Sequence, residues 1–322
     1  MKELEIGTNE AGQRLDKYLK KLLPRADSGF LYKMLRKKNI VLNGKKAEGS
    51  VQLSEGDHVT LYLSDETYEK FSPDKIINIT PESKRNHIPD VQILFENADI
   101  LILNKPAGLL SQKAVSSDFS ANEWVIQYLL DSGAVTRQTL KTFRPSVCNR
   151  LDRNTSGILI AGKTLHGLQV MSRQLKERSV KKYYRCVVAG TLTTGQHLKA
   201  LLSKDNDKNK VEIYHSGNTG RGNGQYIETA YEPLGHCDGC TVLEVHLITG
   251  RSHQIRAHLS SIGHPIIGDP KYGDSQLNRK YRKKIGLTHQ LLHAYRIILA
   301  DGQEVTAPLP EYFAYFDGNM SE

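Results

Sequence analysis

The sequence has few cysteines and no long apolar run. Four cysteines occur in 322 residues, and in a chain of this size they do not indicate a disulfide framework. No apolar stretch approaches the ~20 residues that a membrane-spanning helix requires, and the first residues of the chain form no hydrophobic signal region. We therefore expect a cytoplasmic protein that does not contact a membrane.

Positive charge is concentrated in one segment. The formal net charge is +9, from 44 basic and 35 acidic side chains. Between Gln13 and Lys46 eleven basic residues are opposed only by Asp16 and Asp27, so the remainder of the chain is balanced. This local excess favours a module that binds a polyanion, above all nucleic acid, over a merely solvated basic face. The nucleic-acid contacts that we expect in this module are Arg14, Lys17, Arg36, Lys37 and Lys38.

The same segment has the pattern of a small α/β unit. Leucines at 15, 19 and 22 predict an amphipathic helix that ends at Pro24. Ser28 is expected to cap a second helix over about 28–38. The apolar residues 40–42 then predict a strand that enters an Asn43-Gly44 turn, and 59–63 predict a last short strand.

These residues resemble the small RNA-binding module named for ribosomal protein S-four, the alpha-L motif. The stretches that carry the resemblance are 12–16, 35–37, 41–44 and 53–57. We expect this domain to occupy residues 1–64. A polar segment with three prolines, 65–90, is expected to be a linker, and 91–322 the second domain.

The second domain is expected to be α+β with a mixed, largely antiparallel sheet. Strands are predicted at about 91–95, 100–104, 183–189, 226–231, 241–248 and 291–299. Helices are predicted after a capping box of Ser120 and Glu123, and over 163–178. Because the strands mostly follow one another without alternating helices, they favour antiparallel pairing.

Asp152 is the residue with the most distinctive surroundings. It lies between Arg150 and Arg153, directly before a turn of small residues and the apolar run 158–160. Neighbouring positive charge favours an ionised carboxylate, which is a candidate nucleophile or base when a rigid element holds it. By itself this stretch fits a surface ion-pair cluster equally well.

Three separated stretches resemble the RluA-type family of pseudouridine synthases, particularly the members that act on large-subunit ribosomal RNA. They are 149–157, around Asp152; 181–185, Lys-Lys-Tyr-Tyr-Arg; and 249–256, Thr-Gly-Arg-Ser-His-Gln-Ile-Arg. Segments 103–108, 263–273 and 292–294 also match. The resemblance covers about residues 91–310 and extends to the N-terminal module.

The resemblance assigns roles to four residues. It implies that Asp152 is the essential aspartate, that Arg256 pairs with it, and that Tyr184 rather than Tyr183 is the active-site tyrosine. Arg150 is implied to occupy the space of the extruded base. Isomerising uridine breaks a C–N glycosidic bond and rejoins the uracil through carbon without net redox change. We therefore expect no metal and no organic cofactor.

Several other signals have ordinary explanations. Arg251 and His253 are expected to satisfy backbone carbonyls around a turn rather than to act in catalysis. The Cys237-Asp238-Gly239-Cys240 stretch predicts a hairpin turn instead of a zinc site. The basic run 279–284 fits a solvated helix face and a second phosphate contact equally well. The family usually has histidine where Asn149 stands, and we expect this difference to affect loop packing or substrate choice, not the reaction.

The sequence thus predicts a monomeric two-domain enzyme that isomerises specific uridines of RNA, most of all 23S (large-subunit) ribosomal RNA. Two alternatives remain open. One is an RNA N-glycosidase that uses Asp152 but releases the base; the other is a non-catalytic RNA-binding or ribosome-assembly protein.

Overall fold

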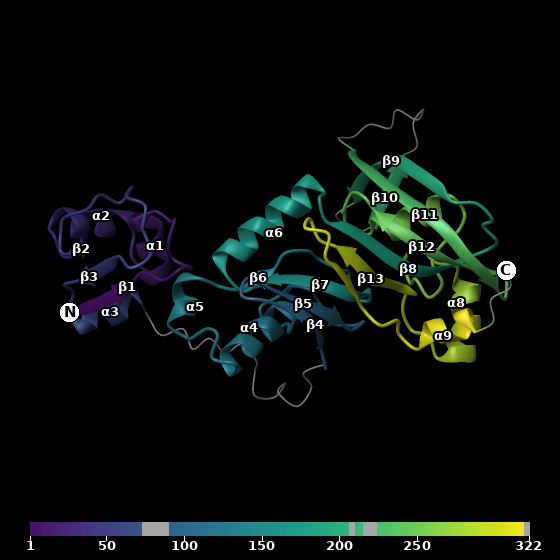
Figure 1. Ribbon diagram of the computed structural model, residues 1–322, viewed down its shortest axis with the longest axis horizontal. Helices are drawn as coiled ribbons and strands as arrows, with labels where there is room; N and C mark the ends of the chain where they lie inside the picture. Colours follow the sequence, from purple (N-terminus) through teal and green to yellow (C-terminus); the bar gives the residue numbers. More distant parts are fainter. Residues whose placement is uncertain (73–89, 206–209, 215–223, 319–322) are drawn as a thin grey trace.

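The computed structural model describes residues 1–72, 90–205, 210–214 and 224–318. A small N-terminal unit, residues 1–72, lies at one end of an elongated molecule, and a larger domain built on one long sheet forms the rest (Figure 1). No helix in these described ranges is long and apolar enough to cross a membrane.

The N-terminal unit packs three helices on a three-stranded antiparallel sheet of order β1-β3-β2. The leucines of the first predicted helix are fully buried in its core, as their spacing predicted. Asn43 and Gly44 both have positive φ, which confirms the tight turn. The cap of the second helix was predicted wrongly: Asp27, not Ser28, accepts the backbone N–H of Phe30. The elements are β1 Lys2–Glu5, α1 Leu15–Leu22, α2 Ser28–Arg36, β2 Ile40–Leu42, β3 His58–Leu61 and α3 Asp65–Phe71.

Helix α3 corrects the N-terminal end of the expected linker. Residues 65–71 are helical, and Ser64 caps them by accepting the backbone N–H of Thr67. Tyr68 is buried in the core of the N-terminal unit, and Phe71 packs against Phe30 with ring centroids 4.4 Å apart. The segment is polar in composition, so the sequence did not indicate that these two aromatic residues are buried in a core. The expected linker residues 73–89 lie outside the described ranges.

The larger domain has a mixed, largely antiparallel sheet, as the sequence predicted. Its strand order is β10-β9-β11-β12-β8-β13-β7-β5-β4, with β14 beside β13 and β6 beside β7. Only the β13–β7 pairing among these described strands is parallel. The strands are β4 Gln92–Glu96, β5 Ile100–Lys105, β6 Ser146–Val147, β7 Ser156–Gly162, β8 Lys181–Ala189, β9 Gln196–Asp205, β10 Lys210–Tyr214, β11 Gln225–Cys237, β12 Cys240–Leu247, β13 Leu292–Ile298 and β14 Glu304–Thr306.

Helices cover this sheet and connect its strands (Figure 1). The predicted helix after Ser120 is present, but its capping box is not: the Ser120 hydroxyl donates to Glu123 rather than accepting a backbone N–H. The helices are α4 Ala121–Asp131, α5 Thr139–Thr142, α6 Leu165–Glu177, α7 Gln254–Ser261, α8 Ser275–Ile285 and α9 Tyr312–Asp317.

Three strands meet in one transverse row at the middle of the sheet. Tyr184 on β8 lies opposite Ala294 on β13, which in turn lies beside Gly157 on β7. Gly157 has φ +107°, and a Cβ there would stand 2.2 Å from the carbonyl oxygen of Ala294. Only glycine therefore permits β7 to approach β13 so closely. This approach places the loop before β7 beside β8.

The two units contact each other through polar groups that are buried or partly buried. The Thr142 hydroxyl of α5 donates to Glu10 at 2.6 Å, and the backbone N–H of Leu165, at the start of α6, donates to the side chain of Asn9. Buried polar groups that find partners fix orientation, because separating them leaves them unsatisfied. The loop before α1 is thus held against the larger domain.

Candidate active site

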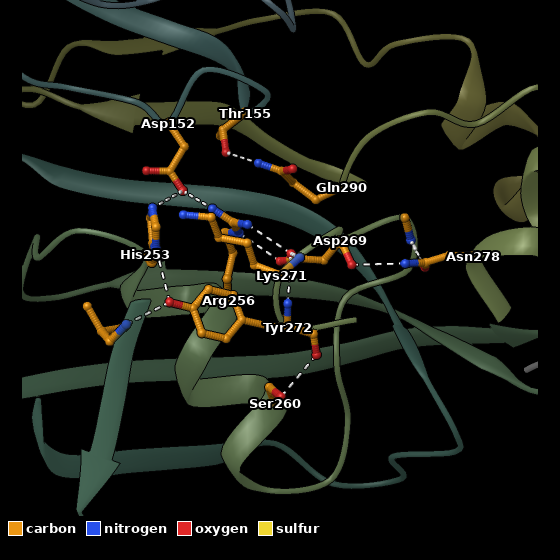
Figure 2. Close-up of polar contacts among 12 residues, drawn as sticks. Asp152, Thr155, His253, Arg256, Ser260, Asp269, Lys271, Tyr272, Asn278 and Gln290 are labelled. Carbon is orange, nitrogen blue, oxygen red and sulfur yellow. Dashed lines mark hydrogen bonds and ion pairs between the residues drawn. The ribbon is translucent and has the colours of Figure 1, made fainter. Parts of the chain in front are cut away.

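Asp152 and Arg256 form an ion pair, as the resemblance to the synthase family implied. Asp152 lies in the loop before β7, and Arg256 lies in the first turn of α7. Arg256 Nη1 donates to Asp152 Oδ2 at 2.6 Å (Figure 2). The arginine side chain is 5% exposed and that of Asp152 is 25% exposed. The carboxylate therefore reaches solvent, while its partner is held in the protein.

Asp269 fixes the arginine from the other side. Arg256 donates to it through Nε and Nη2, at 2.7 and 2.8 Å, in a bidentate pair. Burial opposes the charge of Asp269, but Arg256 and the backbone N–H groups of Lys271 and Tyr272 outweigh it and hold its pKa below the usual value. No role was predicted for Asp269, although it lies in the matching segment 263–273. The signal in the sequence was an acidic residue directly before Pro270 within that segment.

His253 reaches the same carboxylate. Its Nε2 lies 3.9 Å from Asp152 Oδ2, and its Nδ1 lies 3.0 Å from the hydroxyl of Tyr272 (Figure 2). That hydroxyl also accepts the backbone N–H of Val211 on β10 at 2.9 Å, so Tyr272 connects the imidazole to that strand. The prediction of a backbone-binding His253 was wrong, because its left-handed backbone at φ 55° turns the ring toward side chains.

Tyr184 is the strand tyrosine that faces the site. It is buried and lines the same pocket as Asp152. Burial, and secondly the charge of Asp152, raise the pKa of its phenol. Tyr183 belongs to the other face of β8, where it stacks on His246 at 4.7 Å and lies under Arg296. Successive side chains of a strand point to opposite faces of the sheet. Tyr184 therefore faces the pocket and Tyr183 faces away from it, in agreement with the choice of Tyr184.

A buried lysine ties the Asp152 loop to the sheet. Lys105, at the end of β5, is fully buried, and its Nζ donates to the carbonyls of Pro106, Leu109 and Arg153 at 2.8–3.0 Å. Burial lowers its pKa to about 7, against the opposing effect of Asp152. Three acceptors from two loops make this side chain a positioning group for the carboxylate.

Asn149 has a packing role. Its Oδ1 accepts the backbone N–H of Ile160 at 2.8 Å, and its Nδ2 donates to the carbonyl of Ile158 at 3.5 Å. Both partners belong to β7, so the amide fastens the start of the Asp152 loop to the strand that follows it. This accounts for the loop-packing part of the expectation for this position.

The site opens into a strongly basic pocket of about 890 Å³. Asp152 is the one carboxylate among its described lining residues, against eight lysines and arginines. Arg150 and Arg153 are exposed at its edge and do not pair with their sequence neighbour Asp152 among the described ion pairs. The full set of basic lining residues is Lys113, Arg150, Arg153, Lys176, Arg178, Lys182, Arg251 and Arg256.

The basic residues expected to bind nucleic acid in the N-terminal unit do not line this pocket. Arg14 is engaged by Asp16 at 2.6 Å, and Asp16 also accepts the hydroxyl of Tyr32. The other expected contacts are exposed: Lys17, Arg36, Lys37 and Lys38. The structure thus places a second basic surface on the N-terminal unit.

The Cys-x-x-Cys stretch forms the predicted turn. Cys237 and Cys240 face each other where β11 and β12 join, with Asp238 and Gly239 at positive φ. Within the described ranges no group of three or more His, Cys, Asp or Glu side chains could hold a metal ion. In the basic run 279–284, Lys280 and Lys284 bind Asp238 at 2.9 and 3.0 Å.

Comparisons with known proteins identify relatives of this chain. A family model described as RNA pseudouridylate synthase matches residues 99–261. The chain is 30% identical over 319 residues to "Ribosomal large subunit pseudouridine synthase C" of Vibrio parahaemolyticus, covering 95% of this chain and 92% of the relative. It is 32% identical over 312 residues to the protein of the same name from Rickettsia bellii, covering 93% and 95%.

Solved structures share the fold of the larger domain. The structure of human RNA pseudouridylate synthase domain containing 4 superposes with a TM-score of 0.56 at 22% identity, covering 69% of this chain and 90% of the human one. Human RNA pseudouridylate synthase domain containing 1 gives a TM-score of 0.53 at 22% identity, covering 72% and 91%. At this identity the likeness concerns the fold alone.

Proposed function

The chain belongs to the RNA pseudouridylate synthase family, and we propose that it isomerises uridines of large-subunit ribosomal RNA with Asp152 as the essential carboxylate. The single observation that carries the assignment of the residue is the Asp152–Arg256 pair, with one carboxylate held open to a pocket that is otherwise basic. The choice of ribosomal RNA rests on the names of the relatives.

The geometry leaves one oxygen of Asp152 for the substrate. Arg256 and His253 both approach Oδ2, so neither of these two groups engages Oδ1. A fixed cation at Oδ2 holds the carboxylate in one orientation. An anion so placed serves either attack on the sugar of the target nucleotide or removal of a proton from it.

Tyr184 forms a wall of the pocket for the uracil. Its raised pKa keeps the phenol protonated near neutral pH, so it offers a flat face and a hydroxyl, not a phenolate base. We propose that Arg150, which is exposed and lines the pocket, takes the space of the base when the nucleotide leaves its helix. Extrusion costs a few kcal/mol, which such contacts offset.

The N-terminal unit supplies affinity for structured RNA. Its exposed basic residues carry no substrate chemistry, but neutralising phosphates with them releases counterions and strengthens binding. We propose that this unit is an RNA-binding domain of the S-four type and that the protein acts as a monomer, which light scattering of the purified protein can test.

The test is a pseudouridine map of total RNA from cells with and without the gene, complemented by wild type, Asp152→Asn or Tyr183→Phe. We expect sites in large-subunit ribosomal RNA that disappear without the gene, return with wild type and Tyr183→Phe, and stay absent with Asp152→Asn. Sites that return with Asp152→Asn would refute the catalytic assignment. Loss of the mass of uracil from the RNA in vitro would instead indicate an N-glycosidase, and an unchanged map a binding protein.

A further inference from the structure

Resting on this proposed function, we infer that Lys182, Arg178 and Arg251 form a binding site for a phosphodiester group of the RNA, in the pocket wall beside Tyr184. The three residues come from three separate elements. Arg178 caps the end of α6, Lys182 lies near the start of β8, and Arg251 lies in the loop between β12 and α7. All three line the pocket that contains Asp152.

Strand alternation places Lys182 next to the reaction centre. Lys182 and Tyr184 are two residues apart on β8, share one face of the strand and line the pocket together. Lys182 Nζ lies 3.5 Å from the point where a Cβ of Gly250 would stand, which locates the amine against the loop that continues to Arg251. Lys181, on the opposite face, is exposed and outside the pocket lining.

None of the three cations has a carboxylate partner among the described residues. The ion pairs at this pocket engage Arg256 with Asp152 and Asp269, and Lys113 with Glu123 at 3.6 Å. Lys182, Arg178 and Arg251 make no such pair in the part of the chain that the structure describes. They therefore differ from Lys280 and Lys284, whose charges Asp238 compensates.

The cluster is unfavourable until an anion enters it. Lys182 is partly buried, and burial, followed by the charge of Arg178, lowers its pKa below the ordinary value. A bound anion would relieve both effects, since it replaces lost hydration and screens the repulsion of the two cations. Guanidinium and ammonium groups together match the oxygens of a phosphate, which accepts several charge-assisted hydrogen bonds.

The substrate of the proposed reaction brings such an anion to this place. A uridine whose sugar lies at Asp152 carries a phosphodiester on each side, within a few ångströms of the sugar. Arg150 lies in the Asp152 loop, whereas this cluster belongs to the wall formed by α6, β8 and the 249–253 loop. This wall thus serves the uracil through Tyr184 and the backbone of the strand through the cluster, while Arg150 on the Asp152 loop takes the space that the base leaves.

The adjacent lysines of β8 provide a matched experiment. Binding of the full-length protein to an in vitro transcript of large-subunit ribosomal RNA is measured over a series of KCl concentrations for Lys182→Gln and Lys181→Gln. We expect Lys182→Gln to raise the Kd and to reduce the slope of log K against log salt by about 0.7–0.9, the value for one lost phosphate contact. Lys181→Gln should leave the slope unchanged, and Lys182→Arg should restore it.

Equal slopes for Lys182→Gln, Lys181→Gln and wild type would overturn the inference, and so would an equal fall in both variants, which indicates only the general field of the protein. A second measurement changes the RNA instead of the protein. Replacing single phosphates near the mapped target by neutral methylphosphonates should reveal one position that weakens wild type but not Lys182→Gln. If no position behaves so, the assignment fails. Pseudouridine formation by wild type, measured on the same transcript, tests the proposed function separately.

Discussion

The molecule has two positively charged regions, which differ in how far their cations are buried and paired. In the larger domain Arg256 is 5% exposed and is bound by two carboxylates in fixed geometry. In the N-terminal unit the basic residues Lys17, Arg36 and Lys37 are exposed, and no described acidic side chain pairs with them. The first arrangement positions one anion for chemistry, and the second attracts a polyanion without positioning it.

The difference shows what burial does to a charge. A buried cation loses hydration and needs an ion pair or hydrogen bonds in exchange, so its position is defined by those partners. An exposed cation retains hydration and is screened by salt, so it supplies affinity and not geometry. Substitutions in the two regions should therefore change different measured quantities.

The largest effect is expected from Asp152→Asn. The amide keeps the shape of the side chain but supplies no anion, so the rate of pseudouridine formation on bound RNA should fall on the order of a thousandfold or more. The matched control is Asp16→Asn, which removes the acidic partner of Arg14 in the N-terminal unit and should leave that rate unchanged. A smaller loss of rate for Asp152→Asn than for Asp16→Asn would contradict the assignment of the chemistry to the larger domain.

Arg256→Met should destabilise the larger domain. It leaves Asp269, which is fully buried, without its partner, and breaking a buried pair typically costs about 3–5 kcal/mol. Urea unfolding followed by the fluorescence of Trp124, the single tryptophan of the chain, reports on this domain. The control Arg36→Met should change the free energy of unfolding by less than about 0.5 kcal/mol. Adding Asp269→Asn to Arg256→Met should recover part of the lost free energy of unfolding, because it removes the unpaired buried charge. No recovery would show that this charge is not the cause of the loss.

Acid should destabilise the larger domain through His293. This side chain is buried against Ser156, and burial lowers its pKa from 6.5 to about 4. The folded state therefore binds fewer protons than the unfolded state between these values, so stability present above pH 6.5 falls as the pH approaches 4, by about 3 kcal/mol in total. In His293→Leu the free energy of unfolding should fall by about 3 kcal/mol less than in wild type between pH 6.5 and pH 4. A loss in His293→Leu equal to that in wild type would show that this histidine is not the cause.

Neutralising the N-terminal surface should weaken binding without slowing the reaction. Replacing Lys17, Arg36, Lys37 and Lys38 together by Gln removes up to four phosphate contacts, so the salt slope should fall by up to about 3. The rate on saturating RNA should match wild type, because these residues do not line the pocket. A reduced rate on saturating RNA would show that the two regions do not divide affinity and chemistry.

The smallest effect is expected from Tyr272→Phe. It removes the hydroxyl that bonds His253 and Val211, a loss of about 1 kcal/mol that corresponds to roughly a fivefold lower rate. If the tyrosine acts through the imidazole, it should have no further effect in a His253→Ala background. Additive losses would mean that Tyr272 contributes independently of His253.

Local patterns in the sequence were enough for much of the fold. The periodicity of Leu15, Leu19 and Leu22 and the Asn43-Gly44 turn identified their elements correctly, because helix faces and tight turns depend on neighbouring residues. Strands β9 and β10 were not predicted, although Val211 and Ile213 alternate with polar residues in β10; they form by pairing with each other and with β11, contacts between distant residues. Helix α3 was also missed, because its anchors Tyr68 and Phe71 are stabilised by contacts with residues distant in sequence.

The sequence by itself determined which chemical groups are present, their concentration in motifs, and the segregation of charge into the first part of the chain. Only the tertiary structure decided how they pair. Arg150 and Arg153 adjoin Asp152 in sequence, yet the partner is Arg256, 104 residues away, because a loop turns neighbouring side chains apart while the sheet brings α7 to the carboxylate. The same folding brought in Asp269, His253 and Lys105, whose roles depend on burial and contacts between distant residues.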